Sequence, residues 1–384
     1  MISTSHVLDD FRCTARTRFL ARRRFLKAAG VLALGGILEA CGGGSPAASI
    51  AASGTAGSQA ASASTAPKAV ASAAASAAAA TTSATASGAR LLRVGYGGPV
   101  SVMAPLWMAD ATHAYANHGL SVTMRLIQGG ATIPALIAGD VDLFQISAGP
   151  VITADLNGNA DLVFIASALN HATFALYALP SITNAADLKG KVVASDKPGQ
   201  PSDYALRVAL SLLGVKTSEV SILPIGAGNV AFPAMETGQV QASMLAPPES
   251  FHAQDKGYRM LQDIFSQPYQ NIGIVALRSR LTALAPLLPD FLAAYRQGIL
   301  DYNSQPDVAM TVIRKYTKET DPATLKRSYE FQHTAVPYNP SLQPTMKGLQ
   351  AMIDFLAPSL PPTAKNAKPA QFVDTRFLAQ LPKA

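Results

Sequence analysis

The feature that most constrains this chain is an internal repeat, in which residues 129–142 are echoed without a gap by residues 228–241. Both copies place glycine, proline, alanine and valine at matching positions, so that Pro134 corresponds to Pro233. The same offset of 99 residues relates further pairs outside these segments: Val94 and Val193, Pro99 and Pro198, and Ser147 and Ala246. A repeat of this length in one register indicates that two similar structural units follow each other along the chain.

Each copy alternates short apolar strands with helical segments. A strand pattern at residues 91–96 is followed by a glycine/proline loop, a helical pattern at 103–117 and a second strand pattern at 120–127. Strands that alternate with helices at this spacing predict a mostly parallel sheet. We therefore expect an α/β protein with two lobes, each a mostly parallel sheet flanked by helices. Two apolar strands at the lobe boundaries, 174–179 and 271–277, are expected to cross between the lobes.

These patterns divide the chain into segments. We expect a signal peptide at 1–41, an Ala/Ser/Thr/Gly linker at 42–90 that lacks the apolar residues to form a core, lobe I at 91–178 and 272–384, and lobe II at 179–271. Beyond residue 279 the chain is expected to be mainly helical, with helices at 290–303, 306–316, 322–333, 341–356 and 369–381.

The N-terminal segment has the pattern of an export signal that ends in a lipid anchor. Residues 22–27 match the twin-arginine pattern R-R-x-F-L-K, and the mainly apolar residues 28–40 are too few to span a membrane, which takes about 20. Residues 38–41 resemble the lipobox of bacterial lipoproteins, so we expect lipid on Cys41, with Glu39 a departure from the usual small residue. A signal peptide without lipidation is the alternative.

Charge and cysteine content exclude several classes of function. The formal net charge is +7, but residues 91–384 hold 22 basic and 21 acidic residues, so a nucleic acid is disfavoured as the partner. Both cysteines, Cys13 and Cys41, precede this part of the chain. Residues 91–384 therefore form no disulfide, carry no thiolate nucleophile and hold no cysteine-ligated metal.

Several motifs in their order and spacing resemble one protein family. They are Leu92–Tyr96, Ala104–Ala109, Gly139–Asp142, Ser147–Pro150, Ala186–Lys191, Pro198–Ala205 and Pro247–Ser250. Over nearly all of residues 91–382 the chain resembles the nitrate/sulfonate/taurine family of bacterial solute-binding proteins that serve ABC transporters.

The resemblance implies both a fold and a function. The fold is the two-lobed, periplasmic-binding-protein-like fold of type II, with two crossover strands. The function is capture of a small anionic or zwitterionic solute, such as a sulfonate, taurine or nitrate, and its delivery to an ABC permease and ATPase. It implies a monomer without catalytic activity, cofactor or metal, in the periplasm or at the cell surface, and the lipid on Cys41 would tie it to the membrane.

The same reasoning predicts where the solute binds. In open α/β sheets, ligands bind beyond the carboxyl ends of the strands, where amides of helix N-termini are unpaired and favour oxyanions. By this argument and by their place in the loops and motifs, the candidate ligand-binding residues are Gly97, Gly98, Ser101, Ser147, Ala148, Gly149, Gly199, Gln200, Pro201, Ser202, Pro247 and Glu249. Asn170 is a further candidate, because its place close to the predicted crossover would put it at the floor of the cleft. The alternative is that these residues only form turns and helix caps.

Three other residues are of types that often bind ligands, but the sequence around each favours a structural role. Trp107 lies among apolar neighbours in a helical pattern, which favours core packing over a stacking platform for a ligand. Asp140 and Asp142 resemble a carboxylate pair, but the second repeat has Gln241 in place of Asp142, so the unit does not require an acid there.

An enzyme is disfavoured. The sequence has no G-x-S-x-G, H-E-x-x-H or P-loop motif, and its histidines beyond residue 100 are scattered. One related branch makes the pyrimidine part of thiamin and relies on cysteine and histidine clusters, which residues 91–384 lack. An exported enzyme or a ligand sensor on the same scaffold remains the alternative function. The sequence leaves the identity of the solute and the membrane of the anchor open.

Overall fold

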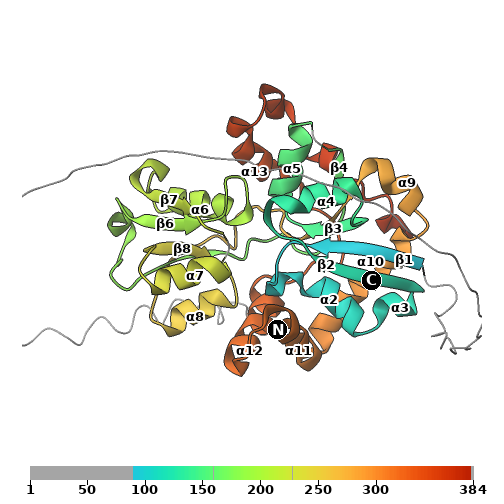
Figure 1. Ribbon diagram of the computed structural model, residues 1–384, viewed down its shortest axis with the longest axis horizontal. Coiled ribbons are helices and arrows are strands. Elements are labelled where there is room, and N and C mark those ends of the chain that lie inside the picture. Colours follow the sequence, from blue (N-terminus) through green and yellow to red (C-terminus); the bar gives the residue numbers. More distant parts are fainter. Residues whose placement is uncertain (1–89, 159, 227, 382–384) are drawn as a thin grey trace, which may run out of the picture. The chain divides into compact units, whose positions relative to one another are not determined.

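The computed structural model describes residues 90–158, 160–226 and 228–381, which belong to one compact unit (Figure 1). The predicted signal peptide, the lipidation site and the linker up to residue 89 lie outside the described residues. No helix in the described ranges combines the length and the apolar character that crossing a membrane requires.

The described strands form two five-stranded sheets. The first has the order β2-β1-β3-β10-β4 and consists of β1 (Arg90–Tyr96), β2 (Leu120–Leu126), β3 (Leu143–Ile146), β4 (Leu162–Ser167) and β10 (Gly273–Leu277). The second has the order β7-β6-β8-β5-β9 and consists of β5 (Ala175–Ala178), β6 (Val192–Ser195), β7 (Ser221–Pro224), β8 (Ala242–Leu245) and β9 (Arg259–Asp263). The predicted two-lobed α/β fold is confirmed.

The two sheets match each other strand by strand. In both, the fourth strand, β10 or β5, is antiparallel to its two neighbours, and the remaining pairs are parallel. Val94 of β1 pairs with Leu143 of β3, and Val193 of β6 pairs with Ala242 of β8. Both residues of the first pair lie 99 positions before their counterparts in the second. The sequence repeat is therefore a structural duplication with the same register.

Helices cover the faces of both sheets. The α-helices of the first lobe are α2 (Ala104–Ala111), α3 (Ala114–Asn117), α4 (Thr132–Ala138) and α5 (Ala148–Leu156), and those of the second are α6 (Pro201–Leu212), α7 (Gly228–Glu236) and α8 (Glu249–Asp255). The C-terminal helices are α9 (Leu281–Leu284), α10 (Leu288–Ser304), α11 (Pro306–Thr317), α12 (Pro322–Glu330) and α13 (Met346–Leu356). A 3-10 turn, η1 (Ser101–Met103), precedes α2, and a π-helical turn at Phe331–Ala335 follows α12.

Three helix predictions need correction. The helix expected at 103–117 is interrupted at His113, whose φ of 59° is left-handed and ends the helical hydrogen bonding. The helix expected at 341–356 begins at residue 346, because Pro344 disfavours helix before it and Thr345 caps the new N-terminus. The helix expected at 369–381 is instead two 3-10 turns, Pro369–Phe372 and Leu378–Gln380.

The chain crosses between the sheets twice, between β4 and β5 and between β9 and β10. The two crossovers run side by side: the Asn271 amide donates to the Leu169 carbonyl at 3.2 Å, and the Ile264 amide donates to the Phe174 carbonyl at 3.2 Å. Because β5 pairs with β8 and β9, it belongs to the second sheet. The first crossing therefore ends before Ala175, earlier than the boundary expected after residue 178.

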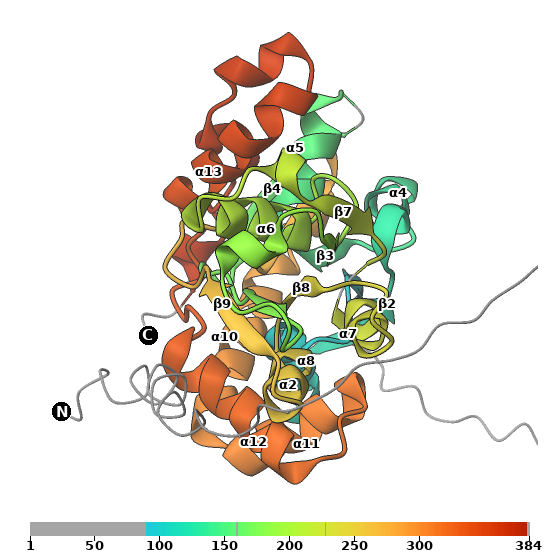
Figure 2. The same ribbon diagram turned by 90° about the vertical axis from the view of Figure 1, so that its left-hand side faces the viewer.

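The cores differ on the two sides of the sheets. One cluster packs α2, α10 and α11 against the first sheet, and a smaller one packs α7 and α8 against the second. A third cluster extends across both sheets, joining Phe144 of β3, Tyr204 of α6 and Met352 of α13. The two views show α13 and α8 at opposite sides of the sheets (Figures 1 and 2). The lobes are thus joined by a shared apolar core on the α13 side.

Candidate functional site

The loops that end β1, β3, β6 and β8 meet between the two sheets. The Ser101 hydroxyl of the first lobe donates to the Pro247 carbonyl of the second at 3.4 Å. At the N-terminus of α5, a Cβ built on Gly149 would lie 2.3 Å from the Gly199 carbonyl oxygen. The predicted site loops therefore face one another, and at Gly149 they touch so closely that only glycine fits.

The N-terminus of α6 is already occupied by carboxylates of the protein. The Gly199 amide donates to Asp203 Oδ2 at 3.0 Å, and the Ser202 amide donates to Asp196 Oδ2 at 3.2 Å. In return the Asp196 amide donates to Ser202 Oγ at 2.7 Å. Burial raises the pKa of Asp196, and the Ser202 hydrogen bonds oppose this rise. Two of the amides expected to bind a solute oxyanion thus bind side-chain oxygens instead.

The N-terminus of α5 is partly occupied as well. The Ala148 amide donates to the carbonyl of Gln270 in the second crossover at 3.2 Å. Beside it, Ser147 is buried at the N-cap of α5 without a capping hydrogen bond from its side chain. The Tyr269 hydroxyl is fully buried nearby and has no hydrogen-bonding partner of good geometry among the described residues. Burial raises the pKa of Tyr269, and the neighbouring Ser147 hydroxyl opposes this rise.

Asn170 lies in the first crossover, where its side chain holds the chain in place. Its Oδ1 accepts a hydrogen bond from the Ser167 hydroxyl at 2.7 Å, and its Nδ2 donates to the Gln343 carbonyl at 2.9 Å. Gln270 Nε2 also donates to the Ser167 hydroxyl, at 2.7 Å. This network links the two crossovers to the loop before α13, so the contacts of Asn170 in this structure are structural.

The remaining candidates differ in how open they are. Gly97 and Gly98 have space around them, because a Cβ on either would meet the nearest side chain only at 3.9 or 3.8 Å. Gly199 has a left-handed φ of 82°, which favours glycine. Gln200 and Pro201 are partly buried at the start of α6. Pro247 is buried and joined to Pro248 by a cis peptide bond.

Glu249 is the one candidate with an ionisable side chain. It is the first residue of α8, and its carboxylate lies against the first residue of α7, since a Cβ on Gly228 would be 3.4 Å from Glu249 Oε2. Burial raises the pKa of Glu249, and apart from its own amide no donor among the described residues binds its carboxylate. Glu249 is half-buried, and its carboxylate would gain a hydrogen bond from a donor that a ligand supplies, so this position suits such a ligand.

Trp107 and Asp142, whose sequence context also suggested binding roles, make structural contacts. Trp107 is fully buried and stacks on Tyr316 with ring centroids 4.3 Å apart, as expected for a core residue. Asp142 Oδ2 accepts from the Arg93 amide at 2.9 Å, and in the second lobe Gln241 Oε1 accepts from the Val192 amide at 3.0 Å. Both side chains therefore accept from a strand amide, and Asp142 in addition forms an ion pair with the Arg93 guanidinium group.

Sequence reasoning missed residues whose contacts are long-range. The Tyr338 hydroxyl donates to the Ser101 carbonyl at 3.0 Å and so fixes the loop after β1. The Tyr295 hydroxyl donates to Gln145 Oε1 at 2.6 Å below the same loop. Tyr295 lies in α10 and Tyr338 in the irregular segment before α13; neither is in a motif or in the repeat, so no local signal distinguishes them from other tyrosines.

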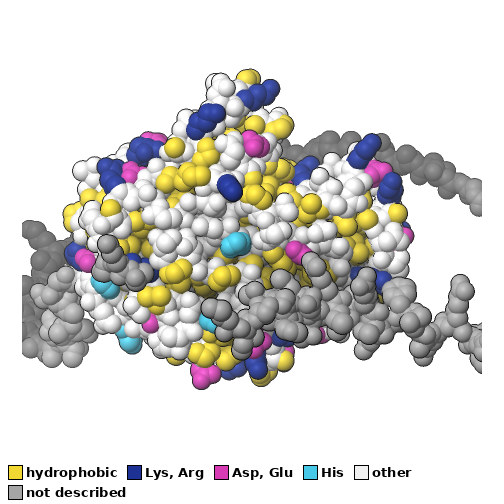
Figure 3. Space-filling view, turned by 180° about the vertical axis from the view of Figure 1, so that it is seen from behind, with side chains coloured by type: hydrophobic (Ala, Val, Ile, Leu, Met, Phe, Trp, Pro, Cys, Tyr) yellow, Lys and Arg dark blue, Asp and Glu magenta, His cyan; other side chains and the backbone are white. Residues whose placement is uncertain are grey.

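Charge around the site is sparse. Lys197 is the one cation in the loops that end β1, β3, β6 and β8, and its side chain is exposed. On the face shown in Figure 3, basic and acidic side chains are interspersed and form no single basic patch. Within the described ranges, no group of three histidine, cysteine or acidic side chains is arranged to hold a metal ion.

Comparison with known proteins identifies the family. The model of the family described as NMT1/THI5 like matches residues 101–309, more than half of the chain. The chain belongs to the NMT1/THI5-like family. A search of curated protein sequences gives no match.

Solved structures with the same fold cover most of this NMT1/THI5-like chain. A protein from Bordetella bronchiseptica RB50 is 19% identical, with a TM-score of 0.64, over 76% of this chain and 96% of its own. The alkanesulfonate-binding protein SsuA from Xanthomonas axonopodis pv. citri, bound to MOPS, is 20% identical, with a TM-score of 0.59, over 77% and 98%. The desulfurization enzyme DszB is 14% identical, with a TM-score of 0.54, over 75% and 97%. The predicted resemblance to periplasmic solute-binding proteins is confirmed for family and fold.

Proposed function

We propose that this chain is the extracytoplasmic solute-binding component of an ABC importer. Two duplicated lobes joined by two adjacent crossovers are suited to closing on a small molecule between the loops that end their strands. The similarity to the alkanesulfonate-binding protein SsuA supports a solute of about the size of an alkanesulfonate. In this proposal the protein holds the solute without changing it and delivers it to a permease.

The hydrogen bonds already made by amides at the N-termini of α5 and α6 limit which class of solute can bind. Asp196, Asp203 and Gln270 already accept from amides that a purely anionic solute would need. The single observation that carries the proposal furthest is the half-buried carboxylate of Glu249, for which the described residues supply no donor apart from its own amide. A positively charged or N–H-donating group would satisfy it, so among anionic and zwitterionic solutes we favour a zwitterion such as taurine.

A matched series of small solutes tests this choice. We expect taurine to raise the melting temperature more than ethanesulfonate, which lacks the ammonium group, or ethanolamine, which lacks the sulfonate. The reason is that a ligand at free concentration c, bound to the folded state, stabilises it by RT ln(1 + c/Kd), so at equal concentration the tighter ligand gives the larger rise. Thermal unfolding and calorimetric titration measure the effect. Equal shifts with taurine and ethanesulfonate would exclude a role for the ammonium group.

The enzyme DszB has the same fold, so an exported enzyme is the alternative to a binding protein. Mass spectrometry of the solute after incubation separates the two functions. A solute recovered unchanged supports a binding protein, whereas a new product would contradict it.

The N-terminal signal supports a location outside the cytoplasm. Residues 22–27 and 38–41 carry the twin-arginine and lipobox patterns, and lipid on Cys41 would hold the protein near its permease. With the long linker that follows, the lobes could reach away from the membrane surface. A monomer fits this role, because each chain contains both halves of the site.

A further inference from the structure

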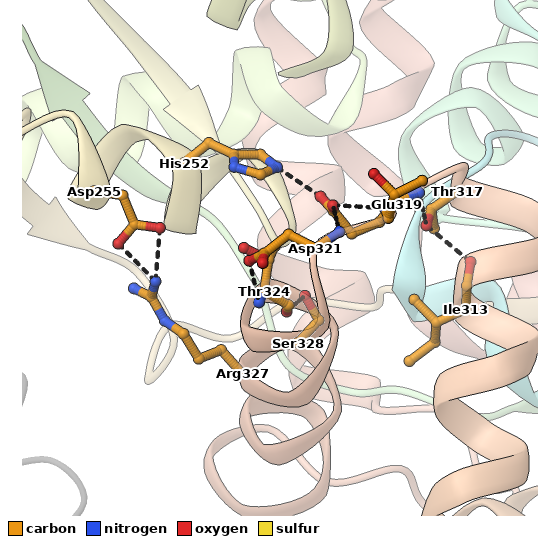
Figure 4. A network of polar contacts seen from close by, with 10 residues as sticks. His252, Asp255, Ile313, Thr317, Glu319, Asp321, Thr324, Arg327 and Ser328 are labelled. Atoms are coloured by element: carbon orange, nitrogen blue, oxygen red, sulfur yellow. Dashed lines mark hydrogen bonds and ion pairs between the residues drawn. The ribbon is translucent and has the colours of Figure 1, made fainter.

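Besides the loops of the site, α8 of the second lobe contacts α12 of the first lobe and the segment that precedes it. Two side-chain contacts join them: the hydrogen-bonded pair His252 and Glu319, and the ion pair Asp255 and Arg327 (Figure 4). We call these four residues the α8 latch. Both contacts lie outside the loops that end the strands, so none of the four is a candidate solute contact.

Glu319 is held rigidly by its own lobe. Its Oε1 accepts from the amides of Thr320 and Asp321, both at 2.7 Å, and its own amide donates to Thr317 Oγ1 at 3.2 Å. The other oxygen, Oε2, lies 2.5 Å from His252 Nε2. The Glu319 side chain is only 8% exposed. The carboxylate is thus presented to the second lobe in a fixed position, which lowers the entropic cost of the contact.

Arg327 binds α8 at a second point, one helical turn after His252. Its Nη1 donates to Asp255 Oδ1 at 2.8 Å and Oδ2 at 3.0 Å, and its Nη2 donates to Gln254 Oε1 at 2.5 Å. Its guanidinium group lies 4.4 Å from the centre of the Phe251 ring. Planar, multiple contacts of this kind fix orientation better than a single ion pair does.

The latch is linked to the site through α8 itself. Glu249 begins this helix, and His252 follows one turn later. The positive charge of His252 lowers the pKa of Glu249, and the negative charge of Glu319 raises it. Asp321 also faces His252: hydrogen bonds with Thr324 are the main cause that lowers the pKa of Asp321, and the charge of His252 adds a smaller effect. The ring of Phe232 in α7 lies 6.1 Å from the His252 ring on the other side.

We infer that Glu319 and Arg327 are positioning residues, which clamp α8 to the first lobe and thereby hold Glu249 in its binding position. On this side the lobes lack the shared apolar core of the α13 side, and the ring of Phe331 supplies the aromatic contacts, with Phe251 and Phe265. Partly exposed polar contacts of this kind break at modest cost. The effect on solute affinity rests on the proposed function, whereas the clamping of α8 does not.

Amide hydrogen exchange of the full chain without added solute tests the latch. We expect Glu319→Gln and Arg327→Gln each to speed exchange at the amides of α8 and of residues 319–327 by roughly three- to tenfold. The strands of both sheets should exchange as before. His252→Gln should reproduce the effect of Glu319→Gln while leaving the turn at 317–321 intact. The double variant His252→Gln/Glu319→Gln should exchange little faster than either single variant, because the two residues form one contact.

The matched control is Glu219→Gln, which neutralises a glutamate paired with Lys189 inside the second lobe at 2.8 Å. It should leave exchange in α8 unchanged. If Glu319→Gln changes α8 no more than this control does, the latch is excluded, whether or not any solute binds. A second readout is the dissociation rate of taurine, expected to rise by a similar factor in the latch variants. Taurine that fails to bind the unaltered protein contradicts the proposed solute and leaves the exchange result to decide the latch.

Discussion

Replacing Gly149 with valine is expected to lower solute affinity by at least about tenfold while both lobes remain folded. A Cβ at this position would lie 2.3 Å from the Gly199 carbonyl oxygen, and backbone cannot yield as a flexible side chain can. The loops of the two lobes would be forced apart at the point where they meet. Calorimetric titration with the best solute of the taurine series measures the loss.

Gly130→Val is the matched control for this substitution. Gly130 lies in the same lobe, has no left-handed φ, and a Cβ there meets nothing within 4 Å. We expect it to keep the affinity of the unaltered protein. If Gly149→Val binds the solute as tightly as the unaltered protein does, the close approach of Gly149 to Gly199 is not required for binding. Circular dichroism and the melting temperature establish that both variants fold.

Replacing Glu249 with glutamine is expected to lower affinity for a zwitterionic solute by about 10- to 100-fold. This is the range for losing a charge-assisted hydrogen bond of about 1.5–3 kcal/mol. The pH dependence should change as well. Since burial raises the pKa of Glu249, its carboxylate is protonated at a higher pH than usual, and affinity should fall as the pH drops through that raised value. Titrations across pH 4–8 should show this fall in the unaltered protein and not in Glu249→Gln.

Stability should respond to the same group with the opposite sign. A carboxyl whose pKa is raised in the folded state binds its proton more tightly there than in the unfolded state, so its contribution to stability improves as the pH falls. Glu236→Gln is the control for Glu249→Gln, because it neutralises a glutamate at the exposed end of α7, where Glu236 pairs with Lys256. An affinity that is insensitive to Glu249→Gln would remove this residue from the site.

The sequence by itself determined the duplication, and with it the fold. Helix and strand periodicities are local, and the two copies kept their spacing, so the offset that relates Val94 to Val193 in the sequence also relates their strand partners in the structure, Leu143 and Ala242. The exchange of Asp142 for Gln241 also predicted that the unit does not require an acid at this position, and in the structure both side chains accept from a strand amide. Which loops face each other followed from the general behaviour of parallel sheets.

Only the tertiary structure decided the chemistry of the site. The candidate amides are filled by Asp196, Asp203 and Gln270, and no local pattern shows that Gln270 approaches Ala148 from the second crossover. The latch joins His252 to Glu319, 67 residues later in the chain. Hydrogen bonds and desolvation depend on which groups meet in space, and the sequence records periodicity along one chain but not the partners brought to it by folding.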